Sequence, residues 1–268
     1  MIRLSVRVAR EHSELVLAEL LELAPSGVEE VDAGDGVIEY AVYGAPGEVP
    51  ALPDLEAAAG EALVAVSTTE IADDWSERWR EFHKPLVLAD TLCVRPPWAP
   101  RSGAAIDIVI DPGQAFGTGA HATTRLCLEL MLDRARPAGS FVDLGCGSGV
   151  LAIAAAKLGY DPVIALDNDP AAVDTTIANA ELNGVAVQTE RFDMRTDQVP
   201  GCDFLAANVL AGPLRAWAAS QRRMPPELIL SGVLREEADR VSRAFAARGL
   251  HERERRVGAE WTALYLVG

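Results

Sequence analysis

The sequence predicts an α/β protein in which a doubly wound, mainly parallel sheet follows a small α+β domain. From about residue 105 onward, apolar strand patterns alternate with helical patterns, which is typical of a parallel sheet covered by helices. The part before it has a different order of patterns. With 268 residues, of which 49% are hydrophobic, the chain can bury a substantial core, and we expect two domains.

The N-terminal patterns are those of a compact α+β domain. Residues 2–8 alternate like a half-buried strand, and residues 15–21 have a helical pattern of Leu and Ala. Two apolar runs around residues 34–36 predict a hairpin, and a short helix at 55–63 and a strand at 63–68 follow. This order of strand, helix, two strands, helix and strand predicts a ferredoxin-like domain of about 70 residues.

The segment DDWSERWREFHKP predicts a helix that connects the domains. Its two Asp residues suit a first turn, and Pro85 ends it. Trp75 and Trp79 lie one turn apart, so we expect both indoles to pack between domains, and a direct contact with substrate is the alternative. The expected parts are a domain at 1–70, a linker helix and connecting segment at 71–104, and the large α/β domain at 105–268.

Strand and helix patterns alternate through the large domain. The strand patterns are AIDIVIDPG, FVDLGCGSG, PVIALDND, CDFLAANVL and ELILSGVL. The helical patterns are TTRLCLELMLDRA, VLAIAAAKLG, AAVDTTIANAELNG, PLRAWAASQRRM and EEADRVSRAFAARG. Because the strands are largely apolar, we expect a parallel sheet with helices on both faces.

The net charge of −16 is concentrated near the N-terminus. Residues 1–74 hold 3 Arg and 16 Asp or Glu, whereas residues 75–268 hold 21 Lys or Arg and 24 Asp or Glu. Such a surface repels nucleic acid and attracts a basic partner at a rate that falls as salt rises, which predicts substrate recognition by the 1–70 domain. The alternative is that the acidity only aids solubility.

Membrane proteins and metalloproteins are not expected. No apolar run reaches the roughly 18 residues of a membrane span, and the first residues alternate instead of forming a signal-peptide core, so we expect a soluble cytoplasmic protein. The four cysteines and four histidines are scattered without a CxxC pair, so neither a metal site nor a disulfide framework is predicted.

The stretch VDLGCGSG predicts a cofactor-binding turn. Asp143 ends a strand, glycines at 145, 147 and 149 form the turn, and a helix begins near Val150. Glycines let a ligand approach the backbone closely, and a helix N-terminus favours negative charge. Asp167 follows Gly145 by 22 residues at the end of the next strand, where a carboxylate can accept both hydroxyls of a ribose. We therefore expect an adenosine here.

Asp143 bears on which adenosine cofactor is bound. Gly147 to Ala152 also fits the GxGxxA variant of the dinucleotide fingerprint, which leaves NAD as an alternative. An acidic residue two positions before the first glycine suits the ammonium group of an amino acid better than a pyrophosphate. S-adenosylmethionine carries an adenosine, a sulfonium and an amino acid, and it fits this pattern. A glycine-rich turn without ligand is the remaining alternative.

A second glycine-rich stretch, DPGQAFGTGAHATT at residues 111–124, contains no lysine. Since the chain has only Lys84 and Lys157, this stretch is not a phosphate loop for a nucleoside triphosphate. His121 is the tempting catalytic residue in it. We expect His121 to fix the loop by hydrogen bonds, and a general base is the alternative.

A series of motifs from about residue 70 onward indicates one family. In chain order they are DWSERWREFHKP, RPPWAP, DPGQAFGTGAHATTRLCLELM, FVDLGCGSGVLAIAAAKLG, ALDNDPAAVDTTIANAELNGV, ANVLAGPL, LSGVL and EWTALYL. In this order they resemble the PrmA family, which methylates protein eleven of the large ribosomal subunit. The resemblance implies a class I S-adenosylmethionine-dependent methyltransferase fold with a seven-stranded sheet. We expect a monomer.

The resemblance also implies roles for individual residues. In this family the FGTGxHxTT segment closes over S-adenosylmethionine, Asp167 would hold the ribose, and Asn208 would face the reacting methyl as the catalytic residue. The implied cofactor-binding residues are Phe116, Gly117, Thr118, Gly119, Thr124, Asp143, Gly145, Gly147, Asp167 and Asn208. Ala120 and Ala122 replace the Thr and Pro of the usual FGTGTHPTT, which makes the loop less rigid.

Methyl transfer to an amine needs a neutral nitrogen held in line with the sulfonium, and little acid–base machinery. A nearby carboxylate would favour the charged amine, so we expect the acidic domain to dock a basic ribosomal protein away from the reacting nitrogen. ANVL lacks the prolines and the aromatic residue of the [DN]PP[YF] motif of nucleic-acid methyltransferases, so no direct nucleic-acid partner is expected. The alternatives are lysines of another protein, a small amine, or a non-catalytic cofactor-binding module.

Overall fold

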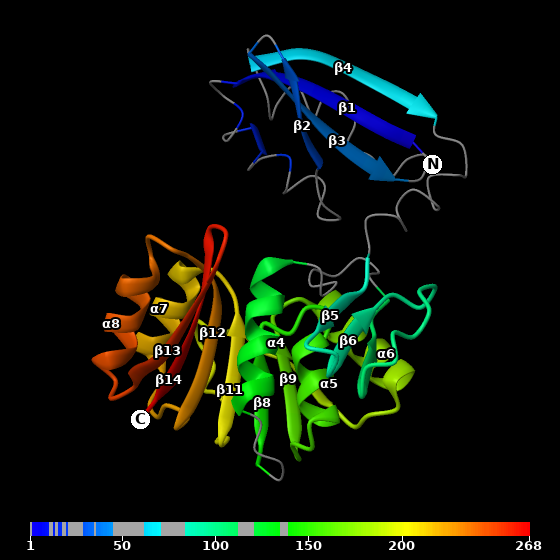
Figure 1. Cartoon of the computed structure of the whole chain (residues 1–268). Helices are drawn as coiled ribbons and strands as arrows, with labels where there is room; N and C mark the ends of the chain where they lie inside the picture. Colours follow the sequence, from blue (N-terminus) through cyan, green and yellow to red (C-terminus); the bar gives the residue numbers. More distant parts are fainter. Residues whose placement is uncertain are drawn as a thin grey trace. The chain divides into compact units, whose positions relative to one another are not determined.

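The computed structural model describes residues 2–10, 13, 16–17, 20, 29–34, 36–44, 62–70, 84–111, 121–134 and 139–268. The chain divides into two compact units, Met1–Phe82 and His83–Gly268, and each is described by itself (Figure 1). Among the residues so described, no helix is long and apolar enough to cross a membrane.

The first unit contains a four-stranded antiparallel sheet with the strand order β2-β3-β1-β4. Its strands are β1 (Ile2–Ala9), β2 (Glu29–Gly34), β3 (Val37–Gly44) and β4 (Leu63–Glu70). β1 lies between β3 and β4 and is antiparallel to both, as in a ferredoxin-like fold. The expected hairpin around residues 34–36 and the expected strands at 2–8 and 63–68 are thereby confirmed.

One face of this sheet forms the core of the first unit. Alternate residues of β1 and β3 are buried there together with two helical residues from the expected helix at 15–21, and the set is Leu4, Val6, Val8, Ile38, Tyr40, Val42, Val16 and Leu20. On the opposite face Glu39 accepts hydrogen bonds from Arg3 and Arg7, each at 2.6 Å. The connecting helix with Trp75 and Trp79, and the helix at 55–63 up to residue 61, lie outside the described residues.

The second unit is built on a seven-stranded sheet with the order β10-β9-β8-β11-β12-β14-β13. Its strands are β8 (Phe141–Leu144), β9 (Val163–Asp167), β10 (Gln188–Arg191), β11 (Phe204–Asn208), β12 (Glu227–Leu234), β13 (His251–Gly258) and β14 (Trp261–Val267). Only β14 is antiparallel to its neighbours β12 and β13. The predicted doubly wound, mainly parallel sheet is confirmed.

Helices pack on both faces of this sheet (Figure 1). In the described part of the chain they are α4 (Ala122–Arg134), α5 (Val150–Lys157), α6 (Pro170–Asn183), α7 (Ala211–Ser220) and α8 (Ala238–Ala246). Neighbouring strand residues point to opposite faces. Phe141 therefore belongs to the core with α4 and α5, whereas Val142 belongs to the core with α7 and α8.

The expected strand AIDIVIDPG lies in a different sheet from the one predicted. β7 (Ile106–Val109) pairs with β6 (Leu92–Arg95), which pairs with β5 (Leu86–Leu88), to form a separate three-stranded sheet. β5 and β6 fall inside the segment expected to be a linker, and they belong to the second unit. Arg95 fastens this small sheet by donating to both carboxylate oxygens of Asp107, at 2.8 and 2.9 Å.

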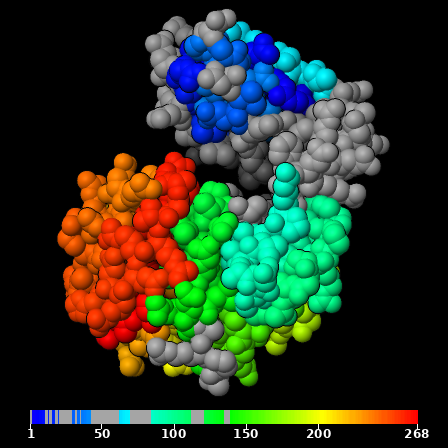
Figure 2. Space-filling model, viewed as in Figure 1, coloured from blue at the N-terminus to red at the C-terminus, as the bar shows by residue number. Residues whose placement is uncertain are grey.

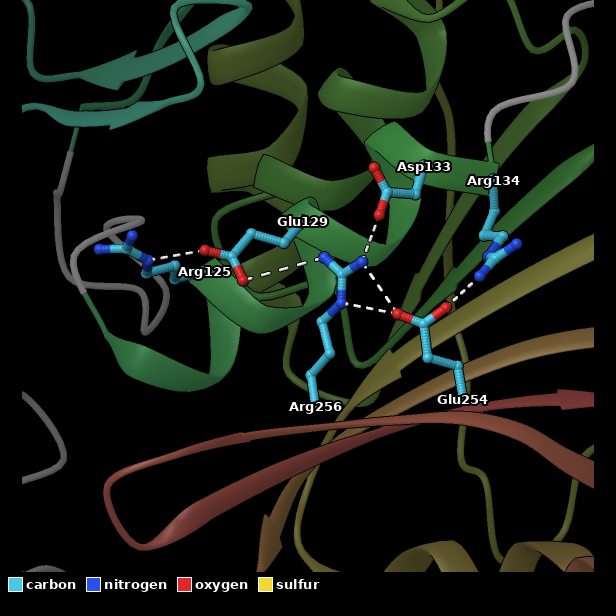
Figure 3. Close-up of polar contacts among 6 residues, drawn as sticks. All are labelled: Arg125, Glu129, Asp133, Arg134, Glu254 and Arg256. Atoms are coloured by element: carbon cyan, nitrogen blue, oxygen red, sulfur yellow. Dashed lines mark hydrogen bonds and ion pairs between the residues drawn. The ribbon is translucent and has the colours of Figure 1, made fainter.

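Two strands of the large sheet have no apolar run that would predict them. β10 has the sequence QTER, and the edge strand β13 has the sequence HERERRVG. Charged side chains of β13 instead contact α4, whose surface adjoins the β13–β14 hairpin in Figure 2. The network in Figure 3 joins Arg125, Glu129, Asp133, Arg134, Glu254 and Arg256. It fixes α4, which leads from the candidate site, to the sheet edge.

Candidate active site

A pocket of about 880 Å³ opens at the carboxyl ends of the parallel strands of the second unit. Its walls come from the β8–α5 turn, the ends of β9 and β11, the first residues of α4 and the start of α7. Ligands of open parallel sheets bind at this edge, and the volume lies in the range that holds a small-molecule cofactor. Of the residues singled out in the sequence, this cavity brings together Thr124, Asp143, Gly145, Gly147, Asp167 and Asn208.

The predicted glycine turn forms the base of the pocket. Gly145 and Gly149 have φ of +77° and +78°, where glycine is favoured over other residues. A Cβ at Gly145 would lie 2.6 Å from Val209 Cγ1, and one at Gly149 would lie 2.7 Å from Thr176 Cγ2. Gly145 N–H also donates to the carbonyl of Leu166 at 2.8 Å, which ties the turn to β9. Close packing against Val209 and Thr176 therefore requires glycine at positions 145 and 149.

Asp143 is buried in the pocket wall, with 1% of its surface exposed. Its Oδ2 accepts from Ala152 N–H at 3.0 Å, whereas Oδ1 is buried and has no hydrogen-bond partner among the described residues. Burial raises the pKa of Asp143 to about 7, the Ala152 hydrogen bond opposes this, and the charge of Asp167 adds to it. A buried carboxylate with an unpartnered oxygen suits a cationic group better than a phosphate.

Asp167 ends β9 beside the glycine turn and is half-buried. Its Oδ2 accepts from Gly147 N–H at 3.0 Å, and its Oδ1 accepts from Asp169 N–H at 3.1 Å. These bonds hold the carboxylate in place. Each carboxylate oxygen has a further lone pair that can accept a hydroxyl hydrogen. The structure therefore places Asp167 in the pocket lining, with both carboxylate oxygens bonded to backbone N–H groups.

Asn208 at the end of β11 contacts Thr124 in the first turn of α4. Asn208 Nδ2 donates to Thr124 Oγ1 at 3.3 Å, and both residues line the pocket. Ser231 Oγ donates to the carbonyl of Thr123 at 3.1 Å, which holds the same turn of α4 against β12. The structure thus brings together two of the predicted residues that lie 84 positions apart.

His121 lines the pocket just before α4. Its Nδ1 and Thr123 Oγ1 are hydrogen-bonded at 2.7 Å, and its ring meets the Trp261 indole edge-on at a centroid distance of 5.4 Å. The carbonyl of His121 also accepts from Arg125 N–H at 3.1 Å, so His121 caps the helix. These contacts tie His121 to the start of α4, and the loop at 112–120 that it is predicted to fix lies outside the described residues.

Other predicted and unpredicted residues complete the account of the pocket. The predicted residues Phe116, Gly117, Thr118 and Gly119 lie outside the described residues. Sequence reasoning missed the lining residues Phe192, Asp193 and Met194, which follow β10, and Leu210 and Trp261. Phe192, Asp193 and Met194 could have been found only from the end of β10. The sequence does not reveal this strand, because β10 has no apolar pattern. In the described part of the chain, no His, Cys, Asp and Glu side chains gather as a metal site would require.

Comparisons with known proteins identify a family. The family model described as "Ribosomal protein L11 methyltransferase (PrmA)" matches residues 48–267. A ribosomal protein L11 methyltransferase of Pelotomaculum thermopropionicum is 41% identical over 208 residues, which cover 75% of this chain and 68% of the relative. One from Burkholderia vietnamiensis is 37% identical over 276 residues and covers 91% of this chain and 90% of the relative.

A solved structure gives the same result. The crystal structure of a ribosomal protein L11 methylase from Lactobacillus delbrueckii subsp. bulgaricus matches with a TM-score of 0.60 and 26% identity. The match covers 68% of this chain and 97% of that one. Taken with the glycine turn, Asp143 and Asp167 at one pocket, these matches settle the family. The chain belongs to the ribosomal protein L11 methyltransferase (PrmA) family.

Proposed function

We propose that the chain transfers methyl groups from S-adenosylmethionine to α-amino groups, lysine ε-amino groups or both, of ribosomal protein L11. The observation that carries this proposal is the pocket wall at Asp143, where a buried carboxylate with one unpartnered oxygen lies under a glycine turn. That arrangement suits a cofactor with an ammonium group and disfavours the pyrophosphate of NAD. The names of the relatives support L11 as the substrate.

The residues present fit S-adenosylmethionine. Asp143 offers a negative charge for the amino-acid end, Gly145 and Gly147 line the pocket without side chains, and Asp167 offers acceptors for the ribose hydroxyls. When bound, the cofactor supplies a methyl group on a cationic sulfonium. The methyl group would pass to the neutral amine as the S–C bond breaks, which would leave S-adenosylhomocysteine, and the methylated ammonium would release its proton to water.

Asn208 is the proposed catalytic residue because it can orient the amine without charge. Its Nδ2 is engaged by Thr124, which leaves the Oδ1 oxygen as an acceptor for an amine N–H. A carboxylate in this position would stabilise the ammonium form and remove the nitrogen lone pair. The α-amino group, with a pKa of about 8, is more readily neutral than a lysine with a pKa of about 10.4. Asn208 therefore acts by position and not by proton transfer.

The resemblance supports a role for the FGTG segment as well. Phe116 and the glycines up to Gly119 would border the cofactor, and Thr124 would hydrogen-bond its methionine end. Ala122, which stands where the family motif has Pro, is the first residue of α4. Alanine is also a good helix former, so the departure leaves the helix start intact and concerns the stiffness of the chain before it.

The first unit is the proposed substrate-recognition domain, at about residues 1–70. This proposal is supported by the charge of residues 1–74, which contain 3 Arg and 16 Asp or Glu. A basic protein would be attracted to this unit while its amine reacts at the other. The same charge argues against direct binding of nucleic acid, and a monomer suffices because every predicted residue lies in one chain.

The test is intact-protein mass spectrometry of purified ribosomal protein L11 incubated with the chain and S-adenosylmethionine. The expected result is mass gain in methyl steps, lost in Asn208→Ala. Cofactor binding is measured separately with S-adenosylhomocysteine by calorimetry, where Asp167→Ala should weaken Kd by about tenfold or more through the lost hydrogen bonds to charge. Binding without any methylation would favour a non-catalytic module, and full affinity in Asp167→Ala would refute the site.

A further inference from the structure

Two asparagines of α6 bond the free edge of β7. In the three-stranded sheet β5-β6-β7, β7 is one of the two outer strands. Its even-numbered residues bond toward β6, as Ile110 N–H does when it donates to the carbonyl of Arg95 at 2.9 Å. The odd-numbered residues face away from β6. Asn183 takes both backbone groups of Val109, accepting its N–H at 2.9 Å and donating to its carbonyl at 2.6 Å. An amide side chain thus replaces the peptide of a missing neighbouring strand.

Asn179, one turn earlier on α6, makes a different connection. Its Oδ1 accepts from Asp111 N–H at 3.0 Å, and its Nδ2 donates to the carbonyl of Ser148 at 3.0 Å. Ser148 lies between the turn glycines Gly147 and Gly149 and is fully buried. Asn179 itself is 1% exposed. One buried side chain therefore bridges the cofactor turn and the residue at which β7 leads toward the FGTG stretch.

We propose that Asn179 is a positioning residue for cofactor binding. This proposal rests on the cofactor site proposed above. Asn179 holds the Ser148 carbonyl, and with it the glycine turn, at a set place relative to Asp111. Without this bridge the Ser148 carbonyl and the Asp111 N–H lose the side chain that joins them in the described part of the chain. Asn183 shares the helix, the residue type and the strand with Asn179 but bonds no residue of the glycine turn. It is the matched control.

The experiment compares Asn179→Ala, Asn179→Asp and Asn183→Ala in the full chain. Asn179→Asp is nearly isosteric and keeps an acceptor for Asp111 N–H, but it places a carboxylate oxygen against the Ser148 carbonyl. Thermal midpoints of the ligand-free proteins are measured first, to establish that each variant folds. Calorimetry then gives Kd for S-adenosylhomocysteine, and steady-state rates on ribosomal protein L11 give KM for S-adenosylmethionine and kcat.

Both Asn179 variants should raise Kd and the cofactor KM by about tenfold, with kcat at saturating cofactor changed by less than about threefold. Asn183→Ala should lower the thermal midpoint while Kd stays within about twofold of the wild type. Amide hydrogen exchange adds an independent readout, because Asp111 N–H should stay protected in Asn179→Asp and lose protection in Asn179→Ala.

Two results would overturn the positioning role. One is wild-type Kd in either folded Asn179 variant, and the other is an equal loss of affinity in Asn183→Ala, which would mean that general packing of α6 decides binding. Asp167→Ala is measured in the same series. Wild-type affinity in that variant would overturn the cofactor site itself, whereas its loss beside unchanged Asn179 variants would overturn the role of Asn179 alone.

Discussion

Asp143 is the residue at which stability and the proposed cofactor binding oppose each other. Its pKa rises from an ordinary 3.8 to about 7 in the folded chain because the carboxyl is buried. Between these pH values the folded state keeps the proton and the unfolded state does not. The contribution of Asp143 to the free energy of unfolding therefore decreases as pH rises through this window, and the full cost is present above about pH 7.

Replacing Asp143 with Asn should remove this pH-dependent cost. Relative to the wild type, Asp143→Asn should gain at most about 3 kcal/mol in the free energy of unfolding between pH 5 and pH 8, since the pKa of about 7 lies about two units above pH 5 and one pKa unit corresponds to about 1.36 kcal/mol. Urea unfolding of both proteins at the two pH values measures the difference. A difference that stays constant with pH would contradict the assigned titration.

The same residue predicts a proton release when the cofactor binds. A cationic group beside Asp143 favours its charged form, so near pH 7 the wild type should release a proton on binding S-adenosylmethionine. Calorimetry in two buffers with different ionisation enthalpies measures this number. Asp143→Asn should bind more weakly and release no proton, and an unchanged release in that variant would assign the proton to another group.

At the scale of the element, the start of α4 is a place where the chain can be stabilised. His121 caps the helix and Ala122 is its first residue, a position whose N–H has no partner within the helix and where proline is favoured. Ala122→Pro should raise the free energy of unfolding by about 0.5 kcal/mol by restricting the unfolded chain. Thermal unfolding measures it, with Ala122→Gly as the control that should shift in the opposite direction. A loss of stability would show that His121 cannot take the extended backbone that proline imposes on it.

The ion network between α4 and β13 predicts another effect at this scale (Figure 3). Hydrogen bonds from Arg134 and Arg256 keep the pKa of Glu254 below its ordinary value, so its contribution is present above about pH 4.5 and is lost as pH falls through the lower, folded value. Glu254→Gln should cost up to about 1 kcal/mol at pH 7. The control is Glu252→Gln, whose partners Arg255 and Ser242 lie outside α4. The pKa values of both carboxyl groups are lowered, so both costs should fall between pH 7 and pH 3, and unfolding at pH 7 compares them. A cost for Glu254→Gln no larger than that for Glu252→Gln would deny a role in holding α4.

The sequence predicts elements well where burial is periodic and the chemistry is local. The apolar strands β8, β9, β11 and β12 and the turn with Asp143 could be recognised because each signal lies within a short window. β10 and β13 could not, since neither contains an apolar run. The sheet of β7 could not be predicted either, because β7 pairs with β6, which lies in the segment expected to be a linker. The Asn208–Thr124 bond, likewise, spans 84 residues and needs the folded sheet.

At the scale of the whole molecule, the charge is divided unequally between the two units. Residues 1–74 carry 16 acidic residues against 3 Arg, whereas the rest of the chain is close to balance, with 24 acidic and 21 basic residues. A field from one part of the chain can speed the encounter with a basic protein without changing the electrostatics at the reacting amine. Such steering is screened by salt, because the Debye length is about 10 Å at 0.1 M.

Electrostatic steering predicts that salt changes the rate at which the substrate protein meets the chain and not the rate of methyl transfer. The kcat/KM for ribosomal protein L11 should fall about tenfold between roughly 0.05 and 0.5 M salt, while kcat changes little. Glu30→Lys in β2 and Glu190→Lys in β10 change the total charge equally at exposed positions of different units. Initial rates should show a drop in kcat/KM of about twofold for the first and almost none for the second. Equal drops would mean that net charge alone matters, and a salt-independent kcat/KM would mean that apolar contacts, not the acidic unit, bring the substrate to the chain.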